Sequence, residues 1–173
     1  MIKISKRIIE CAGRDYGDCF FWLREASLDL SDREHPSCHG RFEVPPITYT
    51  KEAQEYLGCP EAIGCIEQLG YSTLAGLIQE GVIGCRISLD DFLNLPQKSM
   101  LLRRIKQLLF KRAIRKANFN GKITLDSYKL GEPTIFVAKY DFMDKSFFGE
   151  SEFLVYGLEG GDKSQQLLNI NQD

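Results

Sequence analysis

The chain has 173 residues, 43% hydrophobic and 27% charged, which suits one globular domain with a real core. Its formal net charge of −2 argues against a nucleic-acid binder that relies on a broad basic surface. No apolar run reaches the roughly 18 residues that span a bilayer, and no apolar signal core follows the basic N-terminus. We therefore expect a soluble cytoplasmic protein that binds neither nucleic acid nor membrane.

The cysteine and histidine content gives no support for a metal or a nucleotide. The six cysteines form no CxxC motif, and a chain of this length needs no disulfide staples, so we interpret them as free thiols that are mostly buried. Two histidines without a spaced Cys/His cluster do not favour zinc. No GxxxxGK[ST] or GxGxxG motif is present. We expect no metal and no bound cofactor.

The N-terminal quarter predicts a short helix followed by a hairpin. The helix falls within the first dozen residues. Residues 19–30 mix aromatic residues with alternating polar positions, which is typical of a strand, and residues 38–44 predict a second strand. The cluster SDREHPS (31–37) between them favours a turn. Pro45 and Pro46 end the second strand, because neither offers a backbone donor to a ladder.

A long helix is predicted from about Pro60 to Glu80. Proline is accepted in a first helical turn, and Gly81 suits the C-terminal end. Small and apolar residues recur at spacings of three and four, namely Ala62, Ile66, Leu69, Thr73 and Leu77. Residues 82–97 predict a strand or loop, with a turn at Pro96. On periodicity alone, residues 99–116 also predict a helix, with arginines and lysines on its solvated face.

The C-terminal half changes to strand patterns. Residues 122–130, 133–143 and 150–158 are rich in β-branched and aromatic residues, with turns at GEP and around DKSFFG, which predicts an antiparallel meander. The tail 159–173 is polar, and we expect it to be flexible.

The order of these elements predicts an α+β domain over residues 1–158. Two strands, one helix that is apolar nearly all round and then several strands fit an antiparallel sheet wrapped around a long central helix, the hotdog arrangement. The wrapping sheet explains why the helix needs so little polar surface.

Several segments resemble one hotdog family, the FcoT-type fatty acyl-CoA thioesterases. The likeness runs from near Tyr16 to about Leu158. Its strongest parts are GRF (40–42), Tyr49, PEAIGCIEQLGYS (60–72), SMLLRR (99–104) and the sheet segments after Asn118. Within the helix, the residues that match the family pattern are Glu61, Gln68, Tyr71 and Ser72. The resemblance implies a strand for residues 99–116, against the helical periodicity.

Three positions depart from the family pattern. Tyr56 and Gly58 stand where relatives tend to have His and Asn, and Glu67 stands where relatives have Asn before the matching Gln. These departures imply a rebuilt pocket and, with it, a changed substrate.

The resemblance implies a substrate carried as a pantetheine thioester on acyl carrier protein or CoA. Some relatives are thioesterases, and others resemble enzymes that add glycine to a (2E)-enoyl thioester of a carrier protein. That addition gives a 3-(carboxymethylamino)acyl product, as in isonitrile lipopeptide or β-amino-acid pathways. We take glycine addition as the first hypothesis and hydrolysis of medium- or long-chain thioesters as the second. A non-catalytic acyl-binding hotdog protein is the third. The family also implies a homodimer or a higher homo-oligomer.

Both reactions need a polarised thioester carbonyl and a base. The start of the long helix can stabilise an oxyanion through its free N–H groups and dipole, and Gly58 and Gly64 allow a pantetheine arm to approach closely. Glu61 is the first choice of base, because apolar surroundings should raise the pKa of its carboxyl. The alternative is that Glu61 only complements the helix dipole.

Two further residues of the helix are assigned to catalysis. Glu67 lies about 120° around the helix from Glu61, where it could be a second acid or base, a partner for a cation, or a residue exposed at a dimer seam. Gln68 shares the face of Glu61 and could orient the substrate carbonyl or that carboxylate. A purely structural hydrogen bond is its alternative.

The remaining candidates are assigned to substrate binding. Tyr49 and Tyr56 could line the pocket mouth, whereas Tyr71 could be a pocket residue or an anchored core aromatic. His39 could be a base or an ordinary strand residue. Arg103, which matches the family, could bind the glycine carboxylate in bidentate fashion, and Ser99 from the same matching stretch joins this set.

Two groups of residues have weaker functional readings. Cys59 and Cys65 flank the proposed site but lack a matched histidine, which makes them poor nucleophiles. The basic run 98–116 is either a solvated face or a docking surface for an acidic carrier protein or CoA phosphates.

Overall fold

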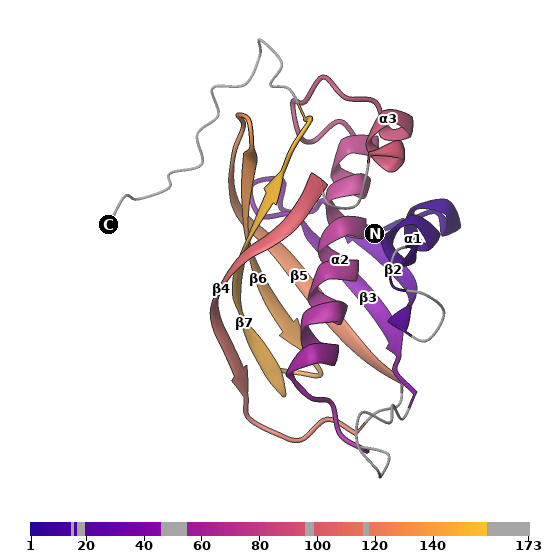
Figure 1. Cartoon of the computed structure of the whole chain (residues 1–173), viewed down its shortest axis with the longest axis vertical. Coiled ribbons are helices and arrows are strands. Elements are labelled where there is room, and N and C mark those ends of the chain that lie inside the picture. The colour runs from indigo at the N-terminus through magenta and orange to yellow at the C-terminus, as the bar shows by residue number, and fades with distance from the viewer. Residues whose placement is uncertain (15, 17–19, 46–54, 96–98, 116–117, 159–173) are drawn as a thin grey trace.

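A computed structural model of the chain describes residues 1–14, 16, 20–45, 55–95, 99–115 and 118–158 (Figure 1). The predicted tail 159–173 lies outside the described residues, as does Tyr49. The helices are α1 (Lys6–Gly13), α2 (Cys59–Gln79) and α3 (Leu89–Asn94). The strands are β1 (Ile2–Lys3), β2 (Leu23–Asp29), β3 (Ser37–Glu43), β4 (Met100–Phe110), β5 (Asn118–Lys129), β6 (Thr134–Phe142) and β7 (Phe147–Val155).

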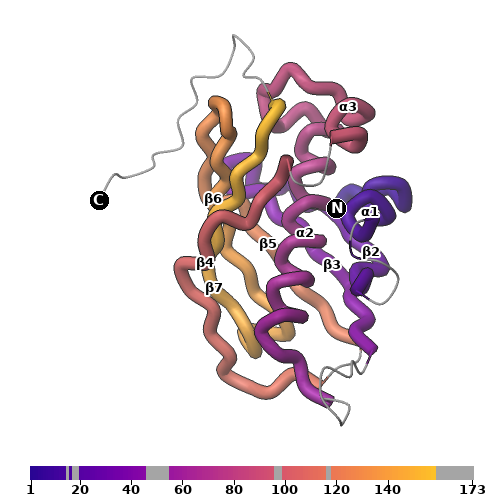
Figure 2. The backbone as a smooth tube through the Cα atoms, viewed as in Figure 1, coloured from indigo at the N-terminus to yellow at the C-terminus, as the bar shows by residue number. Residues whose placement is uncertain are grey.

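The described strands form one antiparallel sheet in the order β1-β2-β3-β5-β6-β7-β4. The sheet curves around α2, which lies along its concave face, and α1 and α3 pack beside α2 (Figures 1 and 2). The hairpin β2–β3 and the meander β5–β6–β7 are both present. The predicted α+β fold with a sheet around a central helix is therefore confirmed.

The ends of α2 follow the signals in the sequence. Pro60 lies in the first turn, and the carboxylate of Glu61 accepts a hydrogen bond from the backbone N–H of Gly58 at 2.9 Å, which satisfies one of the free donors at the helix start. Gly81 follows the helix with a φ of 63°, a conformation that glycine adopts without strain. Almost every residue between Glu61 and Ile78 is buried, as expected for a helix enclosed by a sheet.

Strand β4 shows why periodicity alone predicts the wrong element. It pairs with β7 along its whole length, with bulges that insert Arg103 and Lys106. Each bulge shifts the alternation of the strand by one residue. The half-buried side chains therefore fall at positions 100, 102, 105 and 108, a spacing that imitates a helix. The helix predicted from periodicity is wrong, and the strand implied by the resemblance is confirmed for residues 100–110.

Other departures from the predicted elements are local. The segment 82–97, predicted as a strand or loop, contains the short helix α3, which Ser88 caps by accepting a hydrogen bond from the N–H of Asp91 at 3.1 Å. Six residues are too few to show a helical period. Strand β5 begins four residues earlier than predicted and β7 three residues earlier. The turn before β7 is tighter than predicted, because residues 143–145 all adopt positive φ angles.

The cysteines that the structure describes are free thiols. Burial raises the pKa of Cys38 to about 11. Burial, with a smaller effect of the Glu61 charge, raises the pKa of Cys65 well above its usual value. Both thiols stay protonated at neutral pH and act as small apolar core groups. Among the described residues, no cluster of three or more His, Cys, Asp or Glu could hold a metal ion. No described helix is long and apolar enough to cross a membrane.

Candidate active site

A polar pocket lies where α2 meets α1, β4 and β7. It is a small cavity of about 50 Å³, lined by Ala12, Tyr16, Glu67, Tyr71, Met100, Leu102 and Phe153. The hydroxyl of Tyr16 donates a hydrogen bond to the Glu67 carboxylate at 2.6 Å, a length typical of a charge-assisted bond. Glu67 is only half-buried, so its carboxylate is accessible to a substrate in this pocket.

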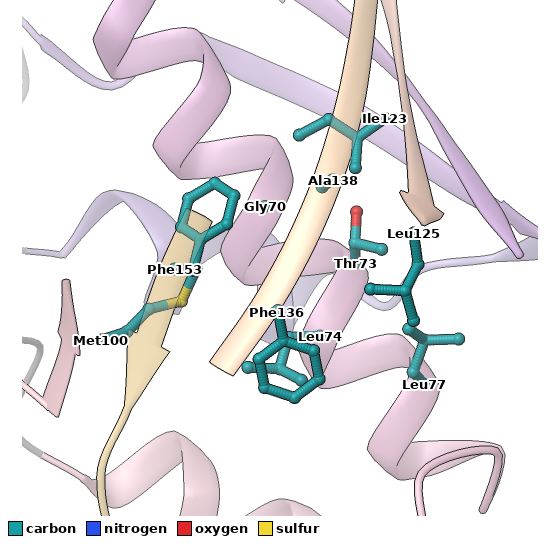
Figure 3. A pocket seen from close by; sticks show the side chains of 10 residues that line it. All are labelled: Gly70, Thr73, Leu74, Leu77, Met100, Ile123, Leu125, Phe136, Ala138 and Phe153. Carbon is teal, nitrogen blue, oxygen red and sulfur yellow. The ribbon is translucent and has the colours of Figure 1, made fainter. Parts of the chain in front are cut away.

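A second pocket lies further along α2, between the helix and the sheet (Figure 3). It is a small cavity of about 20 Å³, lined by Gly70, Thr73, Leu74, Leu77, Met100, Ile123, Leu125, Phe136, Ala138 and Phe153. The hydroxyl of Thr73 donates to the Leu69 carbonyl at 2.7 Å. Because its hydroxyl donor is bound to the helix backbone, this pocket is apolar in character.

The two pockets share Met100 and Phe153. A carboxylate and a tyrosine hydroxyl therefore lie beside an apolar pocket along one helix. This arrangement suits an amphipathic ligand that has a reactive polar head and a hydrocarbon chain.

Glu61, the first choice of base from the sequence, lies elsewhere. Its side chain is fully buried at the start of α2, it caps the N–H of Gly58, and it lines neither pocket beside the helix. The position of Glu61 matches the alternative reading, in which its carboxylate serves the helix start. Glu67, six residues further on, faces the polar pocket instead.

Gln68 is held by three backbone contacts. Its Oε1 accepts hydrogen bonds from the N–H groups of Trp22 and Leu23, each at 3.0 Å, and its Nε2 donates to the Phe20 carbonyl at 2.8 Å. The side chain is fully buried. These contacts match the structural alternative, because they tie the start of β2 to α2 and occupy both acceptor positions of the amide oxygen.

Of the predicted binding residues on or near α2, Tyr71 is the one that lines the polar pocket. Its ring also stacks on Phe92 with a centroid distance of 5.1 Å. The side chain of Tyr56 is 55% exposed, and its backbone forms an isolated antiparallel β-bridge with Arg115. Gly58 is the N-cap of α2. Gly64 packs against Trp22, whose ring would lie 2.8 Å from an added Cβ, so the close approach there is to a core side chain.

His39 and Arg103 lie away from this site. Gly40 faces α2, so His39, its neighbour on the strand, points to the outer face of the sheet. Burial and, to a lesser extent, the charge of Lys122 lower the pKa of His39. The guanidinium of Arg103 lies 4.0 Å from the carboxylate of Glu152. Glu152 points to the outer face of the sheet, because Phe153, the next residue of the strand, faces the pocket. Neither residue is brought together with Glu67.

Ser99 sits beside the site without lining either pocket. Its carbonyl accepts a hydrogen bond from the N–H of Tyr156 at 2.8 Å, which fixes the chain just before Met100.

Sequence reasoning missed Tyr16, Met100 and Phe153 as site residues. Tyr16 is 51 positions from Glu67 along the chain, and only the docking of the N-terminal segment on α2 brings them together. Met100 and Phe153 read as ordinary strand residues. The available signal was the alternation of β7, in which Phe147, Gly149, Ser151, Phe153 and Val155 share the buried face.

Comparison with known protein families gives a match. A model of the FcoT-like thioesterase domain matches residues 14–154, a span that contains the lining residues of both pockets except Ala12. A comparison with curated proteins found no match.

Proposed function

The chain belongs to the FcoT-like thioesterase family, and we propose that it uses Glu67 as a general base on acyl thioesters of CoA or acyl carrier protein. The observation that carries this proposal is the Tyr16–Glu67 pair at a polar pocket that adjoins an apolar one. A thioester has the same division into a polar reacting group and a hydrocarbon chain.

Hydrolysis is the reaction that the geometry supports best. The Glu67 carboxylate takes a proton from a water molecule as the water oxygen attacks the thioester carbonyl carbon. The C–S bond then breaks, the pantetheine thiolate takes up the proton, and a free carboxylic acid remains. Tyr16 positions the carboxylate through its hydrogen bond. We assign polarisation of the carbonyl to Tyr71, which lines the same pocket.

Glycine addition to a (2E)-enoyl thioester is the second candidate. Here the base takes a proton from the glycine ammonium, the nitrogen bonds to the β-carbon, and the enolate takes a proton at the α-carbon. The hydrogen-bonded pair of Tyr16 and Glu67 favours this route, because the two side chains could each serve one of the two proton transfers. Arg103 gives it no support, because its guanidinium pairs with Glu152 on the outer face.

Mass spectrometry of the products tests these reactions. We expect octanoyl and (2E)-octenoyl thioesters, each carried on CoA and on acyl carrier protein, to give free acid and thiol at a rate that does not depend on glycine. A product whose mass equals that of the enoyl thioester plus glycine would establish addition in place of hydrolysis. If none of these thioesters turns over, the proposed activity is wrong and the non-catalytic acyl-binding reading takes its place.

We also propose that the enzyme is a homodimer joined along β4. This strand is an edge of the described sheet. It exposes the large apolar side chains of Leu101 (44%), Leu109 (42%) and Phe110 (39%). Long edge strands with exposed apolar residues invite pairing with another strand. A second β4 laid antiparallel along the first would continue the sheet and cover these side chains.

Light scattering measures the mass of the assembly directly. We expect twice the 19.7 kDa of one chain, and a shift toward monomer in Leu109→Asp, because the new charge would be desolvated at the joined edge. Met143→Asp is the matched control, since Met143 is 43% exposed and lies outside β4. A wild-type protein with the mass of one chain would rule out the dimer.

A further inference from the structure

Arg14 connects the chain segments that carry or support the two tyrosines of the polar pocket. It lies two residues before Tyr16 in the chain. Its guanidinium donates hydrogen bonds to the carbonyls of Leu93 and Leu95 at the end of α3, each at 3.3 Å. We propose that Arg14 is a positioning residue that holds Tyr16 and Tyr71 in one arrangement around the pocket. The inference rests on the proposed function, in which Tyr16 positions the base and Tyr71 polarises the thioester carbonyl.

On the first side of this link, Arg14 belongs to the short turn that presents Tyr16. Arg14 is the C-cap of α1, and its backbone N–H donates to the Cys11 carbonyl at 3.3 Å. The N–H of Tyr16 donates to the Gly13 carbonyl at 3.0 Å, while its hydroxyl reaches Glu67. Because one residue separates Arg14 from Tyr16, a movement of the backbone at Arg14 would also move the tyrosine relative to the carboxylate.

On the second side, the end of α3 supports Tyr71. Leu93 directly follows Phe92, whose buried ring stacks on the Tyr71 ring with a centroid distance of 5.1 Å and an interplanar angle of 28°. Helix α3 has six residues. Isolated helices of this length are not stable in water, so the position of α3 depends on contacts with its neighbours. The last carbonyls of a helix lack partners within it, and Arg14 supplies donors to two carbonyls at this end.

Arg14 acts by fixing positions and not by placing its charge on the substrate. It lines neither pocket, and its side chain is exposed. Two nitrogens of one guanidinium face two carbonyls, a fork that a lysine ammonium does not reproduce. Arg7 offers the matched contrast. It also joins α1 to α3, through a 2.6 Å hydrogen bond to Asp90 in the first turn of α3, but it lies far along the chain from Tyr16.

Steady-state kinetics with octanoyl-CoA test this role. We expect Arg14→Gln to lower kcat by about tenfold, because a small misplacement of reacting groups slows the chemical step. KM should stay unchanged, since Arg14 contacts neither pocket. Arg14→Lys keeps the charge but loses the fork, and should lose as much activity as Arg14→Gln. Arg7→Gln is the matched control and should keep the wild-type kcat.

A coupled substitution shows whether Arg14 acts through the tyrosines. In a protein that already carries Tyr16→Phe and Tyr71→Phe, Arg14→Gln should have no further effect on kcat, because the hydroxyls that it positions are gone. The same tenfold loss in that background would show that Arg14 acts by another route. Wild-type activity in Arg14→Lys would show that the charge is what matters. Either result would overturn the proposal.

NMR of protein labelled at the Cζ carbon of tyrosine separates this inference from the proposed reaction. The resonances of Tyr16 and Tyr71 are assigned by their absence from the two phenylalanine variants. We expect both resonances to shift in Arg14→Gln and neither to shift in Arg7→Gln. If the wild-type protein hydrolyses no thioester yet this pattern appears, the reaction is wrong and the link between the tyrosines stands. If either resonance keeps its place in Arg14→Gln, the link is wrong. Thermal unfolding of each variant confirms that folded protein is compared.

Discussion

Replacing Glu67 with Gln is expected to lower kcat by about 10²–10⁴-fold, the contribution usual for a positioned general base. The amide has nearly the same shape and keeps an oxygen that can accept the hydrogen bond of Tyr16, but it cannot take a proton from water. Because the pocket keeps its form, KM should change little. Initial rates with octanoyl-CoA over a range of concentrations measure both constants.

Two companion substitutions make this result decisive. Glu80→Gln places the same change at the exposed end of α2, away from both pockets, and should leave the rate unchanged. Glu61→Gln tests the acid that the sequence alone favours. If the loss of kcat follows Glu61 while Glu67→Gln stays active, the base is Glu61 and the assignment from the pocket is wrong.

Replacing Gln68 with Leu is expected to lower the free energy of unfolding by about 3–5 kcal/mol. The substitution removes the partners of the Trp22 and Leu23 N–H groups and of the Phe20 carbonyl, and each buried polar group left unsatisfied costs about 1–3 kcal/mol. Part of this cost is recovered by relaxation of the backbone and by the added apolar side chain. Urea unfolding gives the difference directly.

The control for Gln68 lies on the same helix. Gln79 is exposed and bonds only to the neighbouring Glu80 among the contacts described, so Gln79→Leu should change stability by less than about 0.5 kcal/mol. A loss below about 1 kcal/mol in Gln68→Leu would show that the three backbone contacts are not what holds β2 to the helix.

Much of the fold could be predicted because its signals are local. The cap, proline and terminal glycine of α2 all lie within its own sequence, and β2, β3, β6 and β7 show the alternation or composition of strands. Periodicity does not identify strand β4, because its two bulges make the inward-facing positions recur every three residues, as they would in a helix. Helix α3 is too short to carry a period at all.

The candidate site was harder to predict, because it depends on which side of the buried helix α2 faces a pocket and which side packs against other elements. Glu61 and Glu67 lie on one helix about 120° apart, and nothing within the helix tells which side faces a pocket. The side that faces a pocket is determined by where α1 and β4 pack against α2. The direction of Arg103 likewise depends on a bulge. The family resemblance pointed to the helix that lines the candidate site, whereas the geometry separated its two acids.

Two adjacent residues of α2 hold the same part of the N-terminal region. Glu67 binds Tyr16, and Gln68 binds the chain where it enters β2. Local opening that releases this region from the helix would remove the tyrosine from the carboxylate in the same event. Under the proposed mechanism, the turnover rate of the enzyme thus also reports how completely Tyr16 and the start of β2 are docked on α2. Mild denaturant should then quench catalysis before it unfolds the sheet.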